Sequence, residues 1–202
     1  MQVTAVDLVD AGARHRWPDG AESVLRLVPG PLLPSGGDAL VWLDPFDPSD
    51  AAVTAYDGDT RPTSSAVVDW PPGPLRPRGA RAGAAAVVGD AAAAVEWAPV
   101  EGAGGGQAGF GCSYGVGVVV VSQGRERVVE AAARRDWLEP VVERVRVEHV
   151  TPIAVDGVVV GAAFDCGMGS SLNLLWAGLD EDRRTVSVVA DLELLHGATG
   201  RL

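Results

Sequence analysis

The side chains that could carry out acid–base or nucleophilic chemistry in this chain are few and lie far apart. The three histidines are His15, His149 and His196, and no two of them have the spacing of a local zinc-binding pair. The sixteen cationic side chains are all arginine, so a lysine Schiff base or a lysine general base is excluded. We therefore expect no metal site and no cofactor.

The two cysteines, Cys112 and Cys166, are too few for a disulfide framework and lack the partners of a zinc site. Neither stands at the start of a predicted helix, where a thiol becomes more reactive. A Cys–His hydrolase built on one of them stays open as an alternative, because the two side chains could meet only in the folded chain.

A turn of small residues at 165–171 is where we expect a ligand or partner to approach the backbone. It separates two strongly predicted strands, and glycines allow such a close approach. The residues that could make contacts there are Asp165, Cys166, Gly167, Gly169 and Ser170. The alternative interpretation is a plain connection between two strands.

A cluster of aspartates, interleaved with Pro45 and Pro48, marks a second candidate surface. Its members are Asp44, Asp47, Asp50, Asp57 and Asp59. Their spacing does not match the closely spaced oxygen ligands of a calcium loop, whereas Asp-Pro pairs are common in turns. Turn chemistry is the first interpretation, and an acidic face for a protein partner is the second.

The glycine-rich stretch Gly104-x-Gly106-x-x-Gly109 matches a dinucleotide fingerprint in letters only. That fingerprint works because a helix begins at once and directs its N–H groups at the pyrophosphate. Residues 110–121 instead have the composition of strands, so we expect a loop and no bound nucleotide.

The net charge of −11 excludes functions that need a basic surface. Binding to nucleic acid or to an anionic membrane depends on clustered cations. An acidic surface suits solubility or the capture of a basic partner. With no secretory signal pattern in residues 1–10, no apolar run long enough to cross a bilayer and few cysteines, we expect a soluble cytoplasmic protein.

Short apolar runs bounded by Gly, Pro or Asp predict strands along most of the chain. The predicted strands are Val3–Val9, Glu22–Val28, Ala39–Leu43, Ala51–Tyr56, Ala66–Trp70, Ala84–Val88, Ala92–Trp97, Val116–Val121, Gly157–Phe164, Leu172–Ala177 and Thr185–Leu194. The last two flank a charged loop at 180–183 and predict an antiparallel hairpin. The Pro/Gly-rich connector at 71–79 is the only candidate domain boundary, and we keep one domain.

One helical region is expected at about 125–148, because apolar residues recur at helical spacing in its second half. Asp136 and Glu139 have the spacing of a capping box, and Pro140 would then lie in the first turn. Strands, then a helical region, then a hairpin predict an α+β fold with mainly antiparallel strands.

Several short motifs resemble, in order, those of a bacterial family called domain of unknown function 4241. The C-terminal motifs are Phe164–Ser170, Trp176–Asp180 and Val188–Asp191. Earlier ones are Leu33–Gly36 with Asp44-Pro45, Ala84–Val88 with Val95–Trp97, and Tyr114–Val116 before Glu130-Ala131. The chain departs from the family pattern at Met168, Ser170, Ser171, Asn173 and Leu174. The resemblance implies a fold and no particular mechanism.

These observations favour a non-enzymatic protein-binding domain, immunity- or antitoxin-like or accessory, that holds a basic protein partner. The acidic charge and the scattered catalytic residue types support this interpretation. The alternative is an enzyme or small-ligand-binding protein with a pocket at the 165–171 turn. The sequence predicts no oligomeric state.

Overall fold

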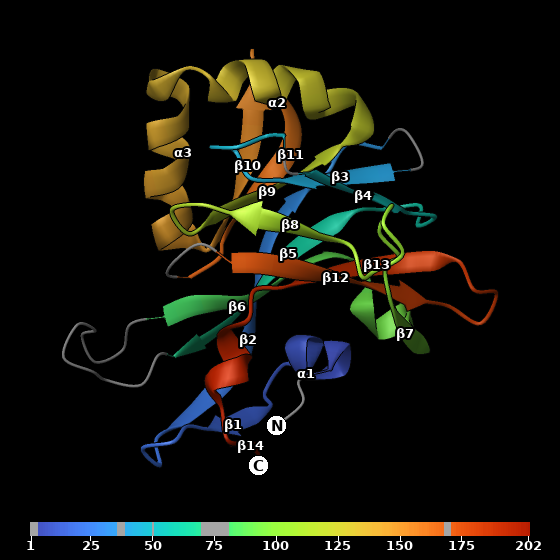
Figure 1. Ribbon diagram of the computed structural model, residues 1–202, viewed down its shortest axis with the longest axis vertical. Helices are drawn as coiled ribbons and strands as arrows, with labels where there is room; N and C mark the ends of the chain where they lie inside the picture. The colour runs from blue at the N-terminus through green and yellow to red at the C-terminus, as the bar shows by residue number, and fades with distance from the viewer. Residues whose placement is uncertain (1–3, 36–38, 50, 70–80, 168–170) are drawn as a thin grey trace.

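The computed structural model describes residues 4–35, 39–49, 51–69, 81–167 and 171–202, and in these residues two antiparallel sheets lie face to face (Figure 1). The nine-stranded sheet has the order β14-β1-β2-β5-β6-β13-β12-β7, and β8 pairs with a second stretch of β12. The five-stranded sheet has the order β10-β11-β9-β3-β4. The α+β fold with mainly antiparallel strands is therefore confirmed.

The strand bounds follow from the runs of apolar and β-branched residues. The larger sheet contains β1 Arg14–Arg16, β2 Glu22–Leu32, β5 Pro62–Asp69, β6 Arg81–Gly89, β7 Glu96–Pro99, β8 Gly109–Cys112, β12 Ser171–Leu179, β13 Thr185–Asp191 and β14 Gly200–Arg201. The smaller sheet contains β3 Ala39–Leu43, β4 Ala51–Ala55, β9 Val116–Val121, β10 Val150–Val155 and β11 Val158–Asp165.

The five-stranded sheet is apolar on both faces because each face packs against a different layer. In β3, Leu40 and Trp42 face the larger sheet, while Val41 and Leu43 face the helices. The rings of Phe110 and Phe164 flank Trp42 in the core between the sheets. Successive side chains of a strand point to opposite faces. Because β3 is covered on both faces, all five of its residues are apolar.

Two helices cover the outer face of the five-stranded sheet, as Figure 1 shows: α2, Arg125–Ala132, and α3, Arg135–Glu148. Val128 of α2 and Val145 of α3 are fully buried against it. The predicted single helical region is therefore two helices, because Arg134 has an extended backbone that ends one and caps the next.

The predicted capping pair of Asp136 and Glu139 is wrong, since the helix begins one residue before Asp136. Pro140 consequently lies inside α3 rather than in its first turn. Its missing N–H leaves one helical carbonyl without the usual donor.

The predicted strand Val3–Val9 is also wrong: residues Ala5–Val9 form the helix α1. Asp7 stabilises the start of α1, because its Oδ2 accepts hydrogen bonds from the Thr4 amide at 2.9 Å and the Thr4 hydroxyl at 2.7 Å. This acidic side chain three residues after Thr is a capping signal that outweighs the β-branched valines. Leu8 anchors the helix on the outer face of the larger sheet.

Most other strand predictions hold in their centres and differ at their ends. The predicted strand Ala92–Trp97 is wrong except for its last two residues, which begin β7. The 3₁₀ turn η1, Ala91–Ala93, occupies its start, because the Asp90 carboxylate accepts a hydrogen bond from the Ala92 amide at 2.9 Å. A second one, η3 at Leu194–Gly197, follows β13, and η2 at Ser122–Gly124 precedes α2. The hairpin formed by β12 and β13 is confirmed.

The connector at 71–79 lies outside the described residues. The strands on either side of it, β5 and β6, pair with each other from Thr63↔Val88 to Asp69↔Arg81. The glycine-rich stretch forms a short loop between β7 and β8, with Gly102 N bonded to Gly106 O at 2.7 Å. A strand and no helix follows it, as predicted.

Candidate functional site

Two turns are fastened to each other by Asp44, at the end of β3. Its Oδ1 accepts a hydrogen bond from the Phe46 amide at 2.8 Å, and its Oδ2 accepts one from the Ser113 amide at 2.7 Å. The side chain is buried, with the whole residue 2% exposed. A buried carboxylate of this kind stabilises both turns, because charge-assisted hydrogen bonds are stronger than neutral ones. Phe46 and Tyr114 therefore have fixed positions relative to each other.

A second set of contacts joins the end of α3 to the turn after β11. His149 Nδ1 lies 3.0 Å from Asp165 Oδ2, and the Asp165 amide donates to the His149 carbonyl at 3.0 Å. Asp165 Oδ1 accepts from the Gly167 amide at 2.9 Å. His149 ends α3 in a left-handed conformation, with φ of 63°. The helix end is thereby fixed to the 165–167 turn.

The 113–115 turn joins this second set through the backbone of Gly115. The Cys166 amide donates to the Gly115 carbonyl at 2.8 Å. Gly115 has a φ of +74°, and a Cβ there would lie 2.2 Å from the Gly167 carbonyl oxygen. Only glycine allows both this conformation and this close approach. Three turns and the end of α3 thus form one connected unit.

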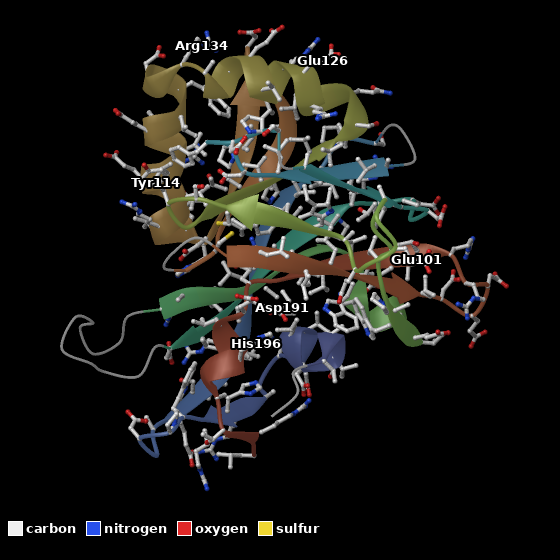
Figure 2. The ribbon with its side chains drawn as sticks, viewed as in Figure 1. Glu101, Tyr114, Glu126, Arg134, Asp191 and His196 are labelled. Atoms are coloured by element: carbon white, nitrogen blue, oxygen red, sulfur yellow. The ribbon has the colours of Figure 1, made fainter. Side chains whose placement is uncertain are left out.

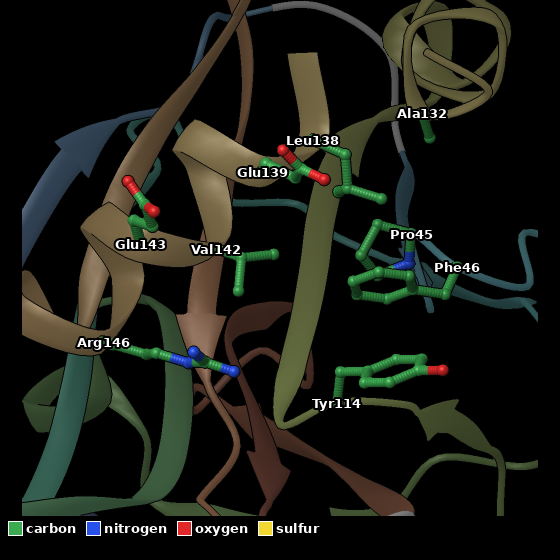
Figure 3. Close-up of a pocket in the computed structure, with 9 residues that line it drawn as sticks. All are labelled: Pro45, Phe46, Tyr114, Ala132, Leu138, Glu139, Val142, Glu143 and Arg146. Carbon is green, nitrogen blue, oxygen red and sulfur yellow. The ribbon is translucent and has the colours of Figure 1, made fainter. Parts of the chain in front are cut away.

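A groove of about 500 Å³ lies between α3 and this unit (Figure 3). One wall carries Pro45, Phe46 and Tyr114, whose two aromatic rings have centroids 4.7 Å apart. The other wall is α3, and the lining residues among those that the structure describes are Pro45, Phe46, Tyr114, Ala132, Leu138, Glu139, Val142, Glu143 and Arg146. The volume falls in the range of roughly 300–1,000 Å³ typical of binding pockets.

The aromatic wall is exposed to an extent that packing alone does not explain. Tyr114 is 73% exposed and Phe46 is 38% exposed, and Figure 2 shows Tyr114 at the edge of the molecule. Tyrosine is enriched among the residues that dominate protein interfaces. The face of its ring also attracts cations. Together with Glu139 and Glu143, the groove can therefore hold an apolar side chain and a basic group.

A larger hollow of about 950 Å³ lies between the β3–β4 turn and the start of α2. Its described lining side chains are polar or charged except for Pro48 and Val129. Without an aromatic anchor among them, it offers less apolar area for a partner to bury. We therefore take the aromatic groove as the candidate site.

The described residues of the predicted site at 165–171 have structural roles and do not line the groove. Gly169 and Ser170 lie outside the described residues. Cys166 is buried in the core between the sheets, and burial, with a contact to the Cys112 thiol, raises its pKa well above the usual value. Asp165 and Gly167 hold the end of α3, next to the groove but outside its lining.

The predicted acidic face is divided by the fold. Asp47 is exposed in the turn before β4, and Asp57 and Asp59 are exposed after it. Because β4 is an extended strand between them, these groups lie at opposite ends of the sheet edge. Asp44 is buried between two turns and contributes no charge to a surface, and Asp50 is not among the described residues.

Sequence reasoning missed the groove residues Phe46, Tyr114, Glu139, Glu143 and Arg146. One signal was present: the last three recur at i, i+4 and i+7 on one helix, which places them on one face. The aromatic wall had no such signal, because the two rings come from turns 68 residues apart that the pairing of β3 with β9 and the hydrogen bonds of Asp44 bring together.

A second histidine–aspartate pair lies elsewhere, after β13 (Figure 2). His196 Nε2 is 3.0 Å from Asp191 Oδ2, with the His196 side chain 47% exposed and that of Asp191 5% exposed. Asp191 Oδ1 also accepts from the Glu193 amide at 2.8 Å. This pair closes the turn into η3, and neither side chain lines the aromatic groove or the larger hollow.

In the described ranges, no three His, Cys, Asp or Glu side chains are grouped so as to hold a metal ion. Nor, among those residues, is any helix both long enough and apolar enough to span a membrane. No protein-family model, curated protein or solved structure matches this chain. The resemblance to the domain of unknown function 4241 family stays a prediction.

Proposed function

We propose that this protein is a non-enzymatic binding protein that holds a basic segment of a partner protein in the groove between α3 and the aromatic turns. The observation that carries this proposal is the exposed pair of rings of Phe46 and Tyr114, which line one groove together with the carboxylates of α3. The net charge of −11 supports it, because an acidic protein attracts basic partners over a distance.

Rigidity of the aromatic wall adds to the affinity that the groove can provide. A side chain that is already ordered loses little conformational entropy when a partner binds. Asp44 fixes the backbone before Phe46 and next to Tyr114 through two hydrogen bonds. The backbone that carries the two rings is therefore already ordered when a partner buries them.

An immunity- or antitoxin-like or accessory role in the cytoplasm fits this mode of binding. Such a role requires a tight complex and no chemical step by this chain. The free thiols of Cys112 and Cys166 are what a reducing compartment maintains. Partner charge is the feature that the acidic groove would select.

Selection of short peptides from a random displayed library on the purified protein tests this proposal. Peptides enriched in Lys or Arg next to an apolar residue are expected, with affinity that falls as salt is added. Tyr114→Asn removes the ring but keeps a residue that tolerates positive φ, and should weaken binding at least tenfold. Glu139→Lys should weaken it further.

The matched control is Glu126→Lys, on the exposed surface of α2 outside this groove. It changes the net charge by the same amount as Glu139→Lys, and should lower affinity only through the general field of the protein. Equal losses in both variants would show that binding is unspecific attraction, and the groove would then have no special role.

A second proposal, a small-ligand or enzymatic site, rests on the His149–Asp165 pair, which follows the groove residue Arg146 by three positions at the end of α3. A histidine oriented by a carboxylate can act as a general base. Asp165→Asn would then abolish an activity while the melting temperature stays unchanged. Loss of the fold in this variant would mark Asp165 as a purely structural residue.

A further inference from the structure

The α3 wall of the groove carries charges of both signs in a fixed order. Glu139, Glu143 and Arg146 occupy positions i, i+4 and i+7 of the helix, so they follow one another along one side. At 1.5 Å per residue, Glu139 and Arg146 are about 10 Å apart along the helix axis. Glu139 therefore marks one end of this charged row and Arg146 the other, with Glu143 between them.

Within the described part of the chain, none of these three side chains takes part in an ion pair. On the same helix, by contrast, Arg144 does form an ion pair, with Glu148 at 3.4 Å. Arg146 is instead exposed and extends from α3 toward the level of Tyr114 (Figure 3). Its guanidinium is thus available to an occupant of the groove.

Alongside this charged row, the groove has an apolar part. Leu138 and Val142 of α3 face Pro45 and Phe46 across it, as Figure 3 shows. An occupant that is basic throughout would leave its charges on this apolar stretch and bring one of them against Arg146. Burial of an unpaired charge and repulsion between like charges both oppose such binding.

We infer that the groove selects an extended partner segment in which a basic residue, apolar residues and an acidic residue follow one another. The basic residue lies by Glu139, and the acidic residue pairs with Arg146. A segment in the extended polyproline II conformation rises about 3.1 Å per residue and repeats its side-chain direction every third residue, so a distance of about 10 Å places the two charges three positions apart on one side of the segment. This inference rests on the proposed function and adds the charge pattern of the partner.

Synthetic peptides of fixed composition test the pattern by fluorescence anisotropy. One carries Lys, two apolar residues and Glu in the order Lys-Leu-Leu-Glu, flanked by Gly and Ser. The second replaces Glu by Lys, and the third replaces Glu by Gln. The first is expected to bind wild-type protein at least tenfold more tightly than the second, with the third between them.

Charge reversal of the selecting residue gives the decisive comparison. In Arg146→Glu the preference should invert, so that the Lys-Leu-Leu-Lys peptide binds at least tenfold more tightly than Lys-Leu-Leu-Glu. Arg127→Glu, on α2 and outside the groove, is the matched control and should keep the wild-type order. Both variants are compared with wild type by melting temperature first.

The possible results distinguish the charge pattern of the partner from the binding function of the groove. An inverted preference in Arg146→Glu alone supports the charge pattern. Binding that depends on Tyr114 but ranks the three peptides alike in wild type and Arg146→Glu overturns the pattern and leaves the groove as a binding site. Failure of the display selection and of all three peptides overturns the binding function itself.

Discussion

Asp44→Ala should destabilise the protein more than any other single loss of an aspartate on the groove side. The wild-type carboxylate accepts hydrogen bonds from the Phe46 and Ser113 amides while the residue is only 2% exposed. Alanine removes both acceptors and leaves two amides without partners in a place that water hardly reaches. Hydrogen bonds to a charged group contribute about 1.5–3 kcal/mol each.

The expected loss in the free energy of unfolding is about 2–5 kcal/mol, because relaxation of the turns recovers part of the two bonds. With an m-value of about 2–3 kcal/mol/M in urea, the unfolding midpoint should fall by roughly 1–2 M. Tryptophan fluorescence is a suitable probe, since the buried indole of Trp42 lies two residues before Asp44 in the chain.

Asp182→Ala serves as the matched control for the change in charge. Its side chain is 81% exposed, and its ion pair with Arg184 is long, at 3.9 Å. Exposed substitutions of this kind usually change stability by less than about 0.5 kcal/mol. If the midpoints of Asp44→Ala and Asp182→Ala coincide within error, Asp44 does not hold the two turns together and the reasoning above is refuted.

Three further predictions follow from buried groups. Burial lowers the pKa of His15 below the ordinary 6.5, and the charge of Asp7 opposes this shift. The unfolded chain therefore binds a proton at a higher pH than the folded chain does, so the free energy of unfolding should fall as the pH drops below about 6.5. In His15→Leu, the slope of the urea midpoint against pH should be flatter. Cys112 and Cys166 are buried thiols and should react with a disulfide reagent only after unfolding in guanidinium; rapid reaction of the native protein would contradict their placement. Gly115→Ala should lower the melting temperature strongly because its Cβ would meet the Gly167 carbonyl at 2.2 Å, whereas the control Gly104→Ala, with nothing within 4 Å, should not.

The sheets could be predicted where the sequence contains one uninterrupted signal. The run Val116–Val121 is buried on both faces and was recognised as β9. The hairpin formed by β12 and β13 was recognised from apolar strands around a charged loop. The structure of such segments can be predicted from the local sequence, because their composition and their turn residues favour the same structure.

Short elements that depend on tertiary contacts were not predictable. β1 is three residues long and exists because it pairs with β2 and β14. α1 was mistaken for a strand because its valines are β-branched, although Thr4 and Asp7 favour a helix start. Both elements also need distant partners: β1 pairs with β14 near the end of the chain, and Leu8 of α1 packs against the larger sheet.

The candidate site was predictable in part only. Asp165 was singled out for its place in a glycine-rich turn, and it does pair with His149 beside the groove. The groove itself depends on Asp44 reaching Ser113, a contact between residues 69 positions apart. Sequence spacing cannot show such a contact, and the aspartates at 44–59 were grouped only because they are neighbours in the chain.

The most direct test of the binding groove is a nuclear magnetic resonance titration of the isotope-labelled protein with a selected basic peptide. Amide shifts are predicted to concentrate on Phe46, Tyr114 and the α3 residues Glu139, Val142 and Arg146. They should be absent from the distant hairpin loop at 180–183 and should disappear in Tyr114→Asn. Shifts that concentrate on any other face, with those five amides unchanged, would contradict the assignment of the groove as the binding site.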